Sequence, residues 1–89
     1  MSRQHLADAA RSLERAAEAA EHDAADRLRQ QSEQFSTLAD ADRGPDHGKL
    51  ARHEHVLAEV ADEEGGRVAD RVDDAIESIH AYRETLEGV

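Results

Sequence analysis

The sequence has no cysteine, a single lysine, a single proline and only two aromatic residues, Phe35 and Tyr82. Without cysteine there is no disulfide framework, no thiolate metal ligand and no thiol nucleophile. No run approaches the roughly 18 apolar residues of a membrane helix. The N-terminal MSRQHLADAA is charged and lacks the apolar region of a signal peptide. These absences predict a cytoplasmic protein that makes no membrane contact.

Proline and glycine interrupt the chain at only two places, RGPDHG at residues 43–48 and EEGG at 63–66. The remaining segments carry apolar residues at steps of three and four, which is typical of amphipathic helices. A chain of 89 residues forms one domain with a thin core. The sequence therefore predicts an all-α fold, a four-helix bundle built from two tandem antiparallel helical hairpins in a single domain, residues 1–89. The predicted helices are Ser2–Ala20, Asp23–Asp40, Asp46–Asp62 and Gly66–Glu87.

An internal similarity supports the two hairpins. Shifting the sequence by 44 residues aligns nine identical pairs, which predicts a repeat of residues 1–44 in residues 45–89. The pairs are 6/50, 7/51, 13/57, 17/61, 25/69, 26/70, 27/71, 33/77 and 44/88. Since residues 21 and 22 align with Gly65 and Gly66, the first half is expected to break near His22, with Asp23 as the N-cap. The alternative is one unbroken helix, Ser2–Asp40, that folds onto the second half only after dimerisation.

Acidic residues dominate the charge. Asp and Glu number 21 against 11 Lys and Arg, a formal net charge of −10, and ten of the eleven cations are arginine. An acidic, alanine-rich surface with almost no lysine fits adaptation to concentrated salt, which screens self-repulsion. An ordinary acidic protein is the alternative. The same charge argues against a nucleic-acid partner, because phosphate binding needs a basic patch.

The segment DRGPDHGKLARHEH, residues 42–55, concentrates three of the six histidines, the proline and the lysine. It is interpreted first as a helix–helix connection. Gly44 would end the second helix in a left-handed conformation, Pro45 would prevent its continuation, and Asp46 would cap the next helix. Ser2 and Gly88 occupy the equivalent positions of the other half, as an N-cap and a helix-ending glycine.

The competing interpretation is a metal site that uses His47, His53 and His55, or Glu77 and His80. Ligands on one helix converge at spacings of three or four, whereas His53 and His55 are two apart and His47 lies six residues before His53. Glu77 and His80 have the Glu-x-x-His spacing of di-iron bundles, but the chain carries one such motif where two are needed. We therefore expect no metal site. His53 is expected to be partly buried, His55 to point outward, and Glu77 and His80 to flank the buried face.

No catalytic pattern accompanies these residues. The serines lack the flanking glycines of a nucleophile elbow, and the glycines form neither a phosphate-binding loop nor a dinucleotide motif. The sequence thus predicts no catalytic residue, no cofactor and no enzyme. It favours a helical interaction or scaffold module with a protein partner or a second copy. Three residues near the C-terminus, Tyr82, Leu86 and Val89, are the predicted contact surface. The alternative function is a metal-binding helical bundle.

The run ADRGPDHGKLARHE, followed by AYRETLEGV, resembles a family of small acidic haloarchaeal proteins of unknown function. The resemblance spans the whole chain and agrees with the salt-adapted composition. It implies no catalytic residue, cofactor or partner. The resemblance implies that the segment from Gly44 to His47 is the family's most distinctive part.

Overall fold

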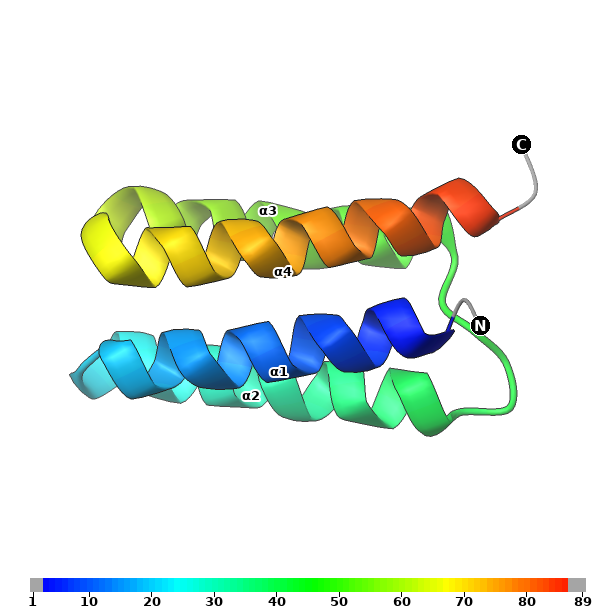
Figure 1. The fold of residues 1–89 in the computed structure, drawn as a ribbon, viewed down its shortest axis with the longest axis horizontal. Coiled ribbons are helices and arrows are strands. Elements are labelled where there is room, and N and C mark those ends of the chain that lie inside the picture. The colour runs from blue at the N-terminus through cyan, green and yellow to red at the C-terminus, as the bar shows by residue number, and fades with distance from the viewer. Residues whose placement is uncertain (1–2, 87–89) are drawn as a thin grey trace.

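The structure is a computed structural model that describes residues 3–86. It confirms the predicted all-α fold, because four helices form two antiparallel hairpins that pack into a bundle (Figure 1). No helix within residues 3–86 combines the length and apolar character needed to span a bilayer. The helices are α1 (Arg3–Ala19), α2 (His22–Asp40), α3 (His47–Glu64) and α4 (Gly66–Thr85).

The break between α1 and α2 confirms four helices and excludes one continuous helix through residue 40. The prediction that Asp23 is the N-cap is wrong, because Asp23 lies inside the first turn of α2. Glu21 holds the cap position with extended backbone, φ −131° and ψ 158°, and no side chain caps the helix. The reversal instead occurs at His22, whose φ of 53° lies in the left-handed region.

Both hairpins turn through a residue of positive φ. His22 at 53° matches Gly66 at 54°, and Gly65 adds a second such residue at 62°. Glycine adopts this region without steric cost, whereas a histidine there is strained by its Cβ. The two turning residues are 44 positions apart, which is the offset of the repeat predicted from the sequence.

The core is centred on α1, which packs against both α2 and α4. Four of its six buried residues are alanines, and such small side chains let the neighbouring helices approach closely. Larger side chains from the other helices fill the space over these alanines. The fully buried ones are Leu28, Phe35, Leu50, Leu57, Val60, Val72 and Ile79. In contrast, α3 packs on α4 but hardly contacts α2, so the bundle is closed along α1 and α4 and loose between α2 and α3.

The connection between α2 and α3 is held by polar contacts at both ends. The Arg3 guanidinium donates to the carbonyl oxygen of Ala41 and, at 2.9 Å, to that of Asp42. Asp46 is the N-cap of α3, as predicted, and its Oδ1 accepts a hydrogen bond from the backbone N–H of Lys49 at 2.8 Å. The predicted equivalents Ser2 and Gly88 lie outside the described residues.

The predicted role of Gly44 is wrong. The described glycines with positive φ are Gly65 and Gly66, and α2 has already ended at Asp40, with Ala41 in extended conformation. Gly44 is needed for a steric reason instead, because a Cβ built on it would collide with the hydroxyl of Tyr82. A glycine here lets the connection lie directly against α4.

We expect Gly44→Ala to lower the free energy of unfolding by about 1–3 kcal/mol, the usual cost of overpacking a well-filled site. Adding Tyr82→Phe should recover much of this loss, because it removes the oxygen that the new Cβ meets. The matched control is Gly48→Ala in α3, where the nearest atom outside the helix backbone, Asp46 Oδ1, is at an ordinary 3.6 Å. That change should stabilise by about 0.5–1 kcal/mol. Urea denaturation measures the free energy of unfolding of the unaltered protein and of the three variants. A Gly44→Ala variant as stable as the unaltered protein would contradict the steric assignment.

Candidate functional site: the α2–α3 seam

The loose contact between α2 and α3 forms two adjoining hollows, of about 300 and 220 Å³. We call the residues that line them the α2–α3 seam. Helix α2 contributes Gln30, Gln31, Glu33, Gln34, Thr37 and Leu38. Helix α3 contributes Lys49, Arg52, His53 and Val56. Lys49 and His53 line both hollows, so the seam is one continuous depression.

His53 links the two helices at the middle of the seam. Its Nδ1–H donates to Oε1 of Gln31 at 2.7 Å, and its ring meets Phe35 edge-on with the centroids 4.9 Å apart. Towards the hairpin turns, Arg27 bridges to Glu63 at 3.4 Å and Glu59 at 3.8 Å. Between His53 and the α2–α3 connection the helices are separated by the larger hollow.

Burial has a clear effect on His53. The residue is only 8% exposed, which confirms the expectation of a partly buried histidine. Desolvation lowers the pKa of His53 below its ordinary value of 6.5, and the nearby positive charge of Lys49 lowers it further. The neutral tautomer with a proton on Nδ1 is therefore the form that supports the bond to Gln31.

The seam is unusual for this chain in being nearly uncharged along α2. Residues 30–38, QQSEQFSTL, include one charged side chain, whereas 36% of the whole sequence is charged. Three of the four glutamines fall within residues 30–34. Depletion of charge characterises the centres of protein interfaces. This neutral run was visible in the sequence and is the feature that sequence reasoning missed.

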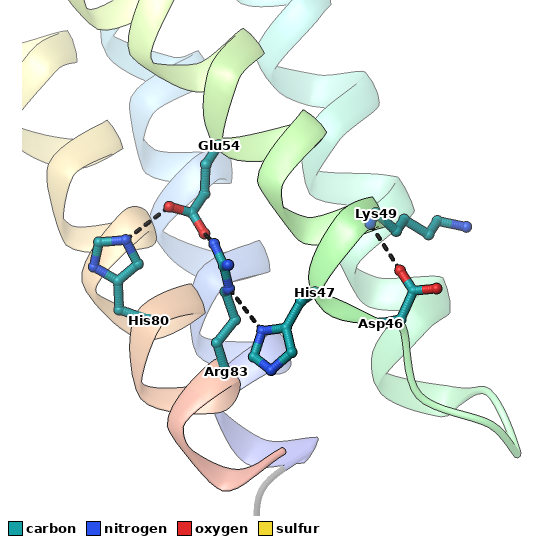
Figure 2. A network of polar contacts seen from close by, with 6 residues as sticks. All are labelled: Asp46, His47, Lys49, Glu54, His80 and Arg83. Carbon is teal, nitrogen blue, oxygen red and sulfur yellow. Dashed lines mark hydrogen bonds and ion pairs between the residues drawn. The ribbon is translucent and has the colours of Figure 1, made fainter. Parts of the chain in front are cut away.

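A second polar cluster joins the opposite side of α3 to α4 (Figure 2). The Glu54 carboxylate accepts from Nε2 of His80 and from the guanidinium of Arg83, both at 2.7 Å. Nε of Arg83 also donates to Nδ1 of His47 at 3.1 Å. Arg83 lies in the last turn of α4, where the helix dipole favours a cation. The cluster ties the end of α4 to the start of α3.

The structure thus brings together two of the predicted candidates, His47 and His80, but through Glu54 and Arg83. Spacing along the chain could not indicate these two partners, because 29 residues separate Glu54 from Arg83 and no spacing rule joins different helices. The guanidinium occupies the space between the histidines. The cluster therefore acts as a structural tie between the helices.

The other candidates lie elsewhere. The side chain of His55 is 78% exposed and near Glu59 at 3.4 Å, as predicted, while Glu77 is exposed on α4. His53 faces the seam, away from His80. Across residues 3–86, no three His, Cys, Asp or Glu side chains are grouped so that they could hold a metal ion.

The predicted C-terminal contact surface is corrected by burial. Tyr82 is 3% exposed and belongs to the core, because the hydroxyl lies against Gly44. Leu86 is partly buried and packs on the same core. Val89 lies outside the described residues. Tyr82 therefore offers almost no exposed surface to a partner.

The lowered pKa of His53 predicts a pH-dependent stability. The unfolded chain takes up a proton near pH 6.5 while the folded chain resists it, so stability is fully present above that pH and falls as the pH drops below it. The charged groups that line the same hollows are Lys49 and Arg52 on α3 and Glu33 on α2.

We expect His53→Gln to reduce the decrease in the free energy of unfolding between pH 7.5 and pH 5.5. The control is His55→Gln, which changes an exposed histidine on the same helix and should leave that decrease unchanged. Urea midpoints in molar salt at the two pH values measure this effect. Equal slopes for the His53→Gln chain and the unaltered protein would contradict the assignment.

Glu54 and Arg83 should be coupled energetically. Their side chains are 16% and 29% exposed, so a double-mutant cycle of alanine variants is expected to give about 1.5 kcal/mol. The exposed pair Arg11 and Asp8, at 57% and 38%, is the control and should give below about 0.5 kcal/mol. Equal coupling energies from thermal or urea unfolding would show that the cluster is not a structural tie.

Comparison with known protein families gives a match over most of the chain. The model of a family of unknown function, DUF7553, matches residues 1–85. No curated protein and no solved structure matches the chain. The match spans both hairpins, including α3 with its seam residues and the Glu54 cluster. The chain therefore belongs to the family of unknown function DUF7553.

Proposed function

We propose that this protein is a non-enzymatic helical interaction module that binds a protein along the α2–α3 seam. The observation that carries the proposal is the combination of a hollow surface with a nearly uncharged run on α2, in a chain that is otherwise densely charged. Surface that must later be covered by a partner is depleted in charge, since each buried charge costs desolvation.

The shape of the seam suits an elongated partner. Leu38, Val56 and the ring of His53 provide apolar surface along the depression, and the glutamines at its edge can both donate and accept hydrogen bonds. Grooves between helices commonly receive a further helix through its apolar face. A helical partner would add the burial that the weak contact between α2 and α3 leaves incomplete.

The charge of the molecule supports the same class of partner. A net charge of −10 disfavours binding to the phosphates of nucleic acid, which requires a basic surface. The acidic, lysine-poor composition supports a role in a salt-rich cytoplasm, where apolar contacts hold while exposed ion pairs are screened.

Site-specific cross-linking in the native host tests the proposal. A photoreactive phenylalanine analogue at Gln34 in the seam is expected to form adducts with protein, because that position would face the partner. The same analogue at Gln4, an exposed glutamine on α1, is the matched control and should form few. Mass spectrometry identifies each adduct. Equal labelling from both positions, or no protein adduct from Gln34, would refute the seam as an interaction surface.

A further inference from the structure

We infer that the occupant of the α2–α3 seam is a second copy of this chain, docked about a two-fold axis parallel to the helices. The inference rests on the proposed function and names the partner. The evidence for a second copy is the distribution of charge over α2 and α3.

Helices α2 and α3 carry opposite charges at two levels along the bundle. Towards the hairpin turns, the cation is on α2 and the anions are on α3, since Arg27 faces Glu59 and Glu63 at 3.8 and 3.4 Å. Towards the α2–α3 connection the signs are reversed, because Glu33 of α2 and Lys49 of α3 line the same hollow. At these two levels the surface of α2 is therefore electrostatically complementary to the surface of α3.

The charges at the second level, Glu33 and Lys49, do not pair with each other within one chain. Neither Glu33 nor Lys49 forms an ion pair with any other residue among 3–86. In Figure 2 the Lys49 side chain extends away from the Glu54 cluster. These two charges are therefore available to a partner surface.

A two-fold axis parallel to the bundle uses this complementarity. It lays α2 of each copy over α3 of the other at the same level, so that Glu33 meets the partner's Lys49 and Arg27 meets the partner's Glu59. Each contact occurs twice, as in any isologous dimer. An axis perpendicular to the helices would place α2 on α2 and α3 on α3 with the two levels exchanged, so Glu33 would meet the partner's Arg27, which is already paired within its own chain. The parallel axis is favoured because it brings together the two charges that are unpaired among residues 3–86, Glu33 and Lys49.

The dimensions of the seam's face are sufficient for a stable dimer. The molecule measures 36 by 22 by 17 Å, and α2 and α3 lie together behind α1 and α4 in the view down the shortest axis (Figure 1). The seam therefore occupies one of the broad faces, 36 by 22 Å. A standard interface buries about 800 Å² on each partner, which this face can supply. At its centre the two copies would cover Leu38, Val56 and His53.

Charge reversal with mixing tests the inference. Glu33→Lys and Lys49→Glu each place like charges at both symmetry-related contacts, so each chain alone should dimerise at least about tenfold more weakly than the unaltered protein. An equimolar mixture of the two variants pairs opposite charges again and should recover a heterodimer of near-original affinity. Sedimentation equilibrium at moderate salt measures association, and native mass spectrometry distinguishes heterodimer from homodimers.

Glu77→Lys is the matched control, because it makes the same change at an exposed site on α4 and should leave dimerisation unaltered. Circular dichroism checks that every variant is helical. A monomeric unaltered protein up to about millimolar concentration overturns the inference, as does a dimer that is insensitive to both reversals or is not restored by mixing. If the protein is monomeric while the analogue at Gln34 captures a different protein, the self-pairing fails and the proposed function stands.

Discussion

The burial of the alanine-rich face of α1 is the contact on which the rest of the structure depends. Because Ala9, Ala10, Ala16 and Ala17 are small, α2 and α4 can both approach α1 closely, and the larger side chains of the other helices fill the space above. Because α2 and α4 both pack on α1, α3 is left with α4 as its only strong neighbour among the four helices. Helix α3 accordingly packs on α4 and leaves its contact with α2 incomplete, so the seam results from how the core is filled.

The polar side chains of α3 divide between its two neighbours. On the side of α4, Glu54 is satisfied by His80 and Arg83, and these contacts tie the hairpin ends together. On the side of α2, the bond from His53 to Gln31 is the only hydrogen bond between the described residues of the two helices besides the contact of Arg27 with Glu63. The side towards α4 is therefore closed by charge pairs, whereas the side towards α2 is lined by the glutamines of α2 and by Lys49 and Arg52 of α3. An interaction along the seam would complete the less satisfied side.

Sequence periodicity accounted for much of this structure. The helix boundaries agree to within one or two residues where both are described, and the faces of His53 and His55 follow from their positions on an amphipathic helix. The errors have two causes. The roles of Gly44 and Tyr82 were predicted from local preferences for left-handed turns and chain ends, whereas a contact between distant segments sets their environment. The N-cap prediction for Asp23 was wrong by two residues, because the turn falls at His22 and the cap at Glu21. Gly44 is the clearest case, since Tyr82, which excludes a larger residue there, is 38 positions away.

By itself the sequence determined the number, length and apolar faces of the helices, the cap at Asp46 and the acidic surface, because these depend on residue type and on spacing along one segment. Only the tertiary structure decided which helices share strong contacts, where Glu54 finds His80 and Arg83, and that the neutral run on α2 borders a hollow. Such features join residues from separate helices, and no local rule relates them. Their positions depend on how four apolar faces of unequal size pack together around α1.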